Sequence, residues 1–212
     1  MKHCSLFTKQ LTLKNISMSI LFFTYKKHFN MKTIIILVLA FFSVTAFSQP
    51  HSKVKTGDKI IDFKAHLIDG TELPLNKLYD QSPLVLIVLR GWPEYQCPVC
   101  TRQVGEFVAE ADQLKKHGAK VLMIYPGPSE VLQEKAKEFT SDFTFPEGFY
   151  FALDPNYEMV NQYGLRWDAP KETAYPSTFV IDKNGKVVFA KVSSSHGGRA
   201  DVEEVVEALK IL

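Results

Sequence analysis

A pair of cysteines at the junction of a buried strand and a helix is the feature that most constrains the fold of this chain. Six consecutive apolar residues, 84–89, precede Cys97-Pro98-Val99-Cys100, and apolar side chains then recur at helical spacing as far as residue 117. A continuous apolar run of this length is typical of a strand that is buried on both faces. The pattern predicts a strand that delivers two cysteines to the first turn of a helix over residues 98–117. Pro98 would stand at the first helical position, where its missing N–H costs no hydrogen bond.

The placement of the two cysteines favours thiol chemistry. The N-terminus of a helix carries partial positive charge and free N–H groups, which stabilise a thiolate. Cys-x-x-Cys motifs lower the pKa of cysteine from about 8.5 to roughly 3.5–7.5. A zinc site would need four ligands, and Cys4 is the only other cysteine in the sequence. A structural disulfide is a weak explanation too, because closing so short a loop removes little entropy from the unfolded chain.

The first 48 residues have the pattern of a leader. Residues 31–33 (Met-Lys-Thr) precede nine apolar residues, 34–42, and residues 46–48 (Ala-Phe-Ser) have a small-x-small pattern. These features are typical of a secretory signal peptide. We expect a non-native upstream extension over residues 1–30, a signal peptide over 31–48 and an exported, periplasmic or extracellular domain over 49–212. The alternative is a membrane anchor over residues 34–47, although a span needs about 20 apolar residues.

Removing the leader reverses the net charge of the chain. The whole sequence has 25 basic and 23 acidic residues, and residues 1–48 contain six Lys and no Asp, Glu or Arg. Residues 49–212 therefore carry 19 basic and 23 acidic side chains, a net charge of −4 with His neutral. No dense Lys/Arg patch predicts binding to nucleic acid. No G-x-G-x-x-G fingerprint predicts a flavin or nicotinamide, so we expect no cofactor and no metal.

The remaining pattern predicts an α/β domain. Strands are expected over residues 60–67, 71–75, 84–89, 119–125, 149–153, 177–182 and 186–192, and helices over 98–117, 129–140, 154–164 and 202–212. Ser129 and Asp154 are placed to cap two of the helices, and Asn184-Gly185 is typical of a hairpin turn. Strands that alternate with helices pair in parallel, whereas a hairpin adds an antiparallel edge. We expect a three-layer sandwich with a central mixed sheet and an N-terminal β-hairpin extension.

Residues 55–212 resemble the thioredoxin superfamily and, within it, the AhpC/TSA redoxin group, which includes peroxiredoxin-like proteins. Besides the Cys-x-x-Cys segment, the resemblance rests on three motifs: Gly57-Asp58-Lys59 through Asp62-Phe63 and Asp69-Gly70, Leu153-Asp154-Pro155 with Tyr163-Gly164, and residues 175–182 (Tyr-Pro-Ser-Thr-Phe-Val-Ile-Asp) with Asn184-Gly185. It implies a thioredoxin-like fold and a thiol-based oxidoreductase. It also implies a cis peptide bond before Pro176, since in such proteins a cis-proline lies against the dithiol.

The sequence departs from the peroxiredoxin pattern at its site. That pattern has Pro seven residues and Thr or Ser three residues before the peroxidatic cysteine, and an arginine just before the late strand. Counting back from Cys97, these positions hold Arg90 and Glu94, and Pro176 stands at the place of the arginine. Counting back from Cys100 gives a partial match, Pro93 with Cys97 in place of the hydroxyl. The peroxidase constellation is therefore incomplete, while the pair needed for dithiol exchange is present.

Three hypotheses about function follow. In the leading one, Cys97 attacks a disulfide of a partner protein and Cys100 resolves the mixed disulfide, after which an external thiol reductant restores the pair. The alternative is an antioxidant thiol peroxidase, in which Cys97 reduces a hydroperoxide and Cys100 condenses with the sulfenic acid. A minor alternative is a copper-binding assembly protein that uses both thiolates and His196.

Several further residues are candidates around the dithiol. Pro176, Trp92 and Tyr175 are expected to shape a substrate groove. Glu94, Arg102 and Arg199 are possible auxiliary charges, as are Arg90 and Arg166, with a solvated surface position as the alternative for each. A carboxylate near a thiolate would raise the pKa of the thiol, or could shuttle protons. The sequence carries no prediction of the oligomeric state.

Overall fold

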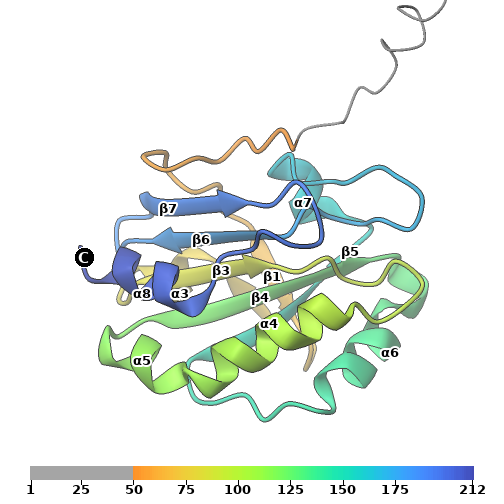
Figure 1. Cartoon of the computed structure of the whole chain (residues 1–212), viewed down its shortest axis with the longest axis horizontal. Coiled ribbons are helices and arrows are strands. Elements are labelled where there is room, and N and C mark those ends of the chain that lie inside the picture. Colours follow the sequence, from red (N-terminus) through yellow and green to blue (C-terminus); the bar gives the residue numbers. More distant parts are fainter. Residues whose placement is uncertain (1–49) are drawn as a thin grey trace, which may run out of the picture. The chain divides into compact units, whose positions relative to one another are not determined.

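The computed structural model describes residues 50–212, which form an α/β unit (Figure 1). The expected upstream extension, the expected signal peptide and Cys4 all lie outside the described residues. Within residues 50–212, no helix has both the length and the apolar character required to cross a bilayer.

Seven strands form a mixed sheet in the order β2-β1-β5-β4-β3-β6-β7. The strands are β1 Lys64–Leu67, β2 Glu72–Pro74, β3 Leu84–Val88, β4 Lys120–Gly127, β5 Phe149–Pro155, β6 Ser177–Ile181 and β7 Val187–Val192. β3, β4 and β5 are parallel, and the remaining pairings are antiparallel. The β1–β2 hairpin extends the sheet beyond β5, and the β6–β7 hairpin forms the opposite edge. Both features confirm the predicted architecture.

Helices cover both faces of the sheet. They are α3 Asn76–Tyr79, α4 Pro98–Ala109, α5 Ala111–Lys116, α6 Ser129–Thr140, α7 Glu158–Gln162 and α8 Val202–Leu209 (Figure 1). The crossovers from β3 to β4 and from β4 to β5 progress in the same direction along the sheet, so right-handed connections place their helices on one face. The buried side chains of α4, α5, α6 and α8 accordingly share one core cluster, and those of α3 and α7 share another.

β3 shows why the apolar run is continuous. Val85 and Ile87 belong to the cluster under α4, whereas Leu84, Leu86 and Val88 belong to the cluster on the opposite face. All five residues of the strand are fully buried. A strand covered on both faces needs apolar side chains at every position, and its rigidity fixes the start of the loop that leads to Cys97.

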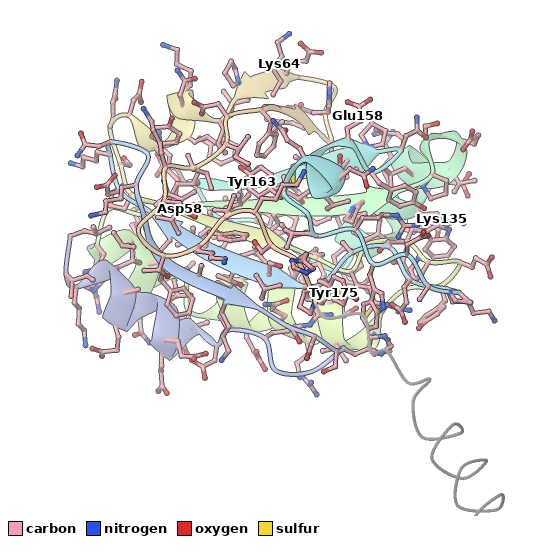
Figure 2. All side chains as sticks on the ribbon, turned by 90° about the horizontal axis from the view of Figure 1, so that it is seen from above. Asp58, Lys64, Lys135, Glu158, Tyr163 and Tyr175 are labelled. Atoms are coloured by element: carbon pink, nitrogen blue, oxygen red, sulfur yellow. The ribbon has the colours of Figure 1, made fainter. Side chains whose placement is uncertain are left out.

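The polar segment that precedes β1, residues 50–59, reaches the β7 edge of the sheet. Lys53 N–H donates to the carbonyl of Tyr163, a residue that lies inside the fold in Figure 2, at 2.9 Å. Gly57 N–H donates to Val187 O at 2.8 Å, and Val187 N–H donates to Asp58 O at 2.9 Å. The segment therefore covers the beginning of β7.

Several local predictions are wrong at their boundaries. The strand expected over 60–67 begins only at Lys64, and the helix expected to reach residue 212 ends at Leu209. The expected helix over 98–117 is divided into α4 and α5 at Glu110, whose φ of −98° and ψ of 17° leave the helical region. Ser129 begins α6 without capping it, because Pro128 occupies the cap position. The helix expected from residue 154 begins only at Glu158, because Asp154 and Pro155 belong to the end of β5. The Asp154 carboxylate nevertheless accepts the N–H groups of Met159 at 2.7 Å and Val160 at 3.0 Å, so it caps α7 from the strand.

Candidate active site

The strand and the helix place the two cysteines as predicted. Cys97 is the N-cap residue of α4, Pro98 is its first residue and Cys100 lies in its first turn. Both thiols are free and buried, with Cys97 3% exposed and Cys100 not exposed. The N-cap backbone of Cys97 is extended, with φ −81° and ψ 112°, and its sulfur makes no capping hydrogen bond to the first turn. The N–H groups of Val99 and Cys100 nevertheless lie close enough to lower the pKa of the Cys97 thiol.

The two thiols are electrostatically unequal. The Cys100 thiol donates a hydrogen bond to the sulfur of Cys97 and is the largest cause that lowers the pKa of Cys97 to about 5, against the opposing effect of burial. The N–H groups of Cys100 and Val99 and the positive charge of Arg199 lower it further. Complete burial raises the pKa of Cys100 well above its ordinary value. These opposite directions favour a thiolate at Cys97 over one at Cys100.

Arg199 brings a guanidinium group to both sulfurs from the loop between β7 and α8. Its Nη1 donates to Cys100 Sγ at 3.4 Å and to Gln103 Oε1 at 2.8 Å, and its Nη2 donates to Cys97 Sγ at 3.9 Å. Its Nε donates to the carbonyl oxygen of His196 at 2.9 Å. The interpretation of Arg199 as a solvated surface residue is therefore wrong, because its guanidinium donates hydrogen bonds to both sulfurs.

The other two candidate charges lie away from the sulfurs. Arg102 has a side chain that is 69% exposed and lies 4.0 Å from Glu106 on the same helix. Together with Arg199 it lines a cavity of about 210 Å³ between α4 and the loop before α8. Glu94 is exposed and has a left-handed φ of 83°. Within residues 50–212, neither side chain donates or accepts a hydrogen bond at a thiol.

Of the three residues expected to shape a groove, Trp92 lies on the loop between β3 and α4. The backbone N–H of Trp92 donates to Pro126 O at 2.9 Å, which ties this loop to the end of β4. Its half-buried ring lies 5.3 Å from the Lys135 ammonium of α6, on a side chain labelled in Figure 2. The loop that carries Cys97 is thus held from two sides.

Tyr175 and Pro176 lie at the start of β6 and are buried. The Tyr175 ring stacks on Trp167 with 4.8 Å between centroids and 9° between planes, and Tyr175 is labelled in Figure 2. The Pro176 carbonyl accepts the N–H of Ser193 at 2.9 Å. This bond joins the start of β6 to the loop that carries Arg199.

The predicted cis bond before Pro176 is wrong, because residues 50–212 contain no cis peptide bond. The trans form is the ordinary state, since only about 5–6% of X–Pro bonds in folded proteins are cis. It also allows both neighbouring backbone groups to be satisfied: Tyr175 N–H donates to Leu165 O, and Pro176 O accepts from Ser193.

A buried ion pair next to this site was missed by sequence reasoning. Arg90 is 1% exposed, and its Nε donates to Glu172 Oε2 at 2.5 Å. The guanidinium also donates to the carbonyl of Lys171 and lies 4.8 Å above the ring of Tyr95. The other oxygen of Glu172 lies 2.9 Å from His196 Nε2. An arginine directly after six apolar residues was the available signal, because a charge there must be buried and paired.

Two further polar residues have roles that the sequence did not indicate. Gln103, 5% exposed on the inner side of α4, holds Nη1 of Arg199. Arg166 donates through Nη1 to three carbonyls, those of Trp167, Glu172 and Thr173. Arg166 therefore stabilises the loop that presents Glu172 and is not itself at the thiols.

The described residues give the copper hypothesis no third ligand. Within residues 50–212, no group of three or more His, Cys, Asp or Glu side chains is arranged to hold a metal ion. The ring of His196, which that hypothesis requires, is engaged through Nε2 by Glu172.

A mixed sheet whose central strand ends in a buried dithiol at a helix N-terminus defines a thiol-based oxidoreductase of thioredoxin-like fold. Residues 56–190 match the sequence model of the AhpC/TSA family, and the chain belongs to that family. The sequence resemblance is thereby confirmed.

The individual relatives include both a thiol-disulfide oxidoreductase and a peroxiredoxin. The chain is 25% identical over 184 residues to the thiol-disulfide oxidoreductase ResA of Geobacillus thermodenitrificans, which covers 85% of this chain and 95% of that protein. It is 27% identical to the chloroplastic peroxiredoxin Q of Oryza sativa subsp. japonica, over 65% of this chain and 58% of the relative. Among solved structures, the peroxidoxin BcpB of Mycobacterium tuberculosis is similar with a TM-score of 0.61 and 24% identity, over 75% of this chain and 98% of that one. This likeness confirms the fold.

Proposed function

We propose that this protein is a thiol–disulfide oxidoreductase in which Cys97 is the attacking thiolate and Cys100 the resolving thiol. The opposite pKa shifts of two adjacent thiols carry the proposal. A reactive thiolate and a protonated reserve thiol are what two successive exchange steps require, since only the thiolate is nucleophilic. The similarity to a protein named thiol-disulfide oxidoreductase, over nearly the whole length of that relative, supports it.

The reaction proceeds in two exchanges. The Cys97 thiolate attacks one sulfur of a substrate disulfide, forms a mixed disulfide and releases the other sulfur as a thiolate. Cys100 then loses its proton, attacks Cys97 Sγ and releases the second substrate thiolate, which leaves Cys97 and Cys100 joined by a disulfide. Two electrons pass to the substrate, and an external thiol reductant returns them to the protein. The partners are therefore a disulfide-bearing protein and this reductant.

The surrounding residues have distinct proposed roles. The Arg199 guanidinium stabilises negative charge on whichever sulfur is deprotonated, because it reaches both. Pro176, Tyr175 and Trp92 shape the groove that receives the substrate chain. Cys97 is only 3% exposed. A substrate disulfide must therefore approach along the one direction from which its sulfur can reach Cys97 Sγ.

The test is reduction of the disulfides of insulin by the fully reduced protein, compared with the Cys97→Ser and Cys100→Ser variants. We expect turnover that needs Cys97, and a trapped mixed disulfide with substrate in Cys100→Ser. A rate equal to that of free dithiothreitol at the same thiol concentration, or full activity without Cys97, would refute the proposal.

Arg199 also favours a second candidate, a thiol peroxidase. One of the objections to it was the missing arginine of the peroxiredoxin pattern, and a guanidinium does reach Cys97 from another part of the chain; the hydroxyl of that pattern is still replaced by Glu94. In this reaction the Cys97 thiolate attacks a hydroperoxide oxygen, giving a sulfenic acid and, after proton uptake, an alcohol or water. The Cys100 thiol then condenses with the sulfenic acid to give the disulfide and water. Stopped-flow oxidation by hydrogen peroxide and by an alkyl peroxide decides the matter, because only a peroxidase reacts far faster than a free thiol.

We also propose that residues 31–48 direct export and that the domain acts outside the cytoplasm. Support comes only from the charged start, the short apolar run and the small residues before residue 49. Mass spectrometry of the N-terminus after expression in a bacterial host tests this. A mature N-terminus near Gln49 in the soluble exported fraction is expected. Retention of residues 34–47 in the membrane fraction would favour the anchor.

A further inference from the structure

The Arg90–Glu172 pair contacts the loop that carries Arg199, because Glu172 lies against His196 of that loop. We propose that Glu172, held by Arg90, is a positioning residue that fixes Arg199 against the two thiols through His196. The inference rests on the proposed function, because it assigns a role to residues that support the same dithiol. None of these residues except Arg199 touches a sulfur.

A continuous series of contacts links the buried pair to the sulfurs. Glu172 Oε2 accepts Arg90 Nε at 2.5 Å, and Glu172 Oε1 lies 2.9 Å from His196 Nε2. The carbonyl oxygen of His196 accepts Arg199 Nε at 2.9 Å, and the two Nη groups of Arg199 reach Cys100 Sγ and Cys97 Sγ. The side chain of His196 therefore anchors the loop, and its backbone orients the guanidinium.

The loop needs such an anchor. Apart from the bonds of Arg199 itself, its other side-chain hydrogen bonds are internal, since the Ser193 hydroxyl donates to the carbonyls of Ser195 and Gly197. Two glycines, Gly197 and Gly198, directly precede Arg199, and Gly198 has a φ of +69°. Glycines lower the resistance of a loop to motion. Of the described side-chain hydrogen bonds of residues 194–198, the one between His196 and Glu172 is the bond that reaches another part of the fold.

The burial of the Arg90–Glu172 pair indicates a role beyond stabilising the fold. Arg90 is 1% exposed and the Glu172 side chain 12% exposed, and one Arg90 nitrogen, Nη1, is buried without a hydrogen-bond partner among residues 50–212. Ion pairs in such surroundings are weak stabilisers, because desolvation offsets their attraction. Such pairs nevertheless hold their side chains in a fixed orientation. Here the fixed carboxylate of Glu172 presents its second oxygen, Oε1, to His196 in the loop of the active site.

The experiment measures alkylation of Cys97 by iodoacetamide as a function of pH, with the modified cysteine identified by mass spectrometry. The variants are Glu172→Gln, His196→Ala, Arg199→Met and the double variant of the last two. His66→Ala is the matched control: its side chain is 45% exposed and lies 3.5 Å from Glu72, against 44% and 2.9 Å for His196 and Glu172. Thermal melting of each variant reports its folding.

We expect Arg199→Met to raise the midpoint for Cys97 by about one pH unit, as loss of a neighbouring opposite charge does. His196→Ala and Glu172→Gln should each raise it by about half as much, and His66→Ala should leave it unchanged. The double variant should equal Arg199→Met, since residues that act through one group are not additive.

Two results would overturn the inference: an unchanged midpoint in a folded His196→Ala protein while Arg199→Met raises it, or full additivity in the double variant. His196 is nearly half exposed, so this variant keeps the test valid even if Glu172→Gln does not fold. If Arg199→Met also leaves the midpoint unchanged, the assignment of Arg199 in the proposed function fails first. Loss of insulin reduction in Cys97→Ser remains an independent test of that function.

Discussion

The pH profile of Cys97 reactivity is the sharpest consequence of the unequal thiols. With a pKa of about 5, Cys97 is about 99% thiolate at pH 7, against about 3% for an ordinary cysteine of pKa about 8.5. The advantage in thiolate is therefore about thirtyfold. Nucleophilicity falls with pKa, however, with a Brønsted coefficient of about 0.4–0.5, so each Cys97 thiolate reacts roughly 25–55 times more slowly. The two effects nearly cancel at pH 7.

Lowering the pH to 5.5 separates them. Cys97 is still about 75% thiolate there, whereas an ordinary cysteine is about 0.1% thiolate. The same loss of nucleophilicity then leaves Cys97 roughly twentyfold faster than an ordinary thiol. We therefore expect similar rates at pH 7 and a large advantage at pH 5.5, so that the profile and not the neutral rate identifies the site.

The assay follows alkylation of the reduced protein by iodoacetamide from pH 4 to 9, with glutathione as the ordinary thiol and Cys97→Ser as the control. Peptide mapping assigns the modified residue. A midpoint near 8.5, or first modification at Cys100, would refute the reasoning from the hydrogen bond and burial. Slow alkylation at every pH with a midpoint near 5 would instead show that the 3% exposure of Cys97 limits access.

Three further predictions concern the resolving thiol, the loop and the buried carboxyl. Cys100→Ala, which removes the donor, should raise the pKa of Cys97, because its largest stabilising hydrogen bond comes from the Cys100 thiol; a titration at 240 nm that shows no rise contradicts this. Gly91→Ala should destabilise the fold by several-fold more than Gly57→Ala in urea unfolding, since both have positive φ but only at Gly91 does a Cβ meet backbone, at the Pro126 carbonyl. Burial raises the pKa of Asp154 from 3.8 to about 6, so the folded state binds the proton more tightly and its stability falls as pH rises through this window, by up to about 3 kcal/mol. Urea unfolding of Asp154→Asn at pH 4 and pH 7 should show this dependence removed, and an equal dependence in both proteins would disprove it.

The fold followed from local pattern wherever the pattern had one physical meaning. A six-residue apolar run followed by a helical pattern is typical of a strand covered on both faces, and it placed β3 and the dithiol. Asp154-Pro155 was ambiguous, because the same pair begins a helix or ends a strand. Its pairing with Pro126 and Gly127 of β4 decided the matter, and that contact is not visible in a local window.

The site divides in the same way. Cys97 and Cys100 are placed by one strand and one helix, so their positions were predictable. Arg199 reaches Cys100 from 99 residues away, and Glu172 reaches Arg90 from 82 residues away. Such contacts depend on how three loops meet at the end of the sheet. The prediction of a cis peptide bond before Pro176 rested on the resemblance alone. In the trans form the backbone N–H of Tyr175 and the carbonyl of Pro176 are both hydrogen-bonded.

The two ends of the sheet bear on how this chain behaves when it is crowded. Exposed edge strands act as templates on which other chains add by hydrogen bonding, the first step of many aggregates. β2 has only three residues and ends at Pro74, which has no N–H to offer. At the opposite edge, residues 57–59 already pair with the start of β7. The β2 edge is therefore too short to offer a long ladder, whereas the pairing on β7 ends at Val187. In a concentrated solution of the folded domain, the remainder of β7 is thus the part of the sheet on which another chain would add first.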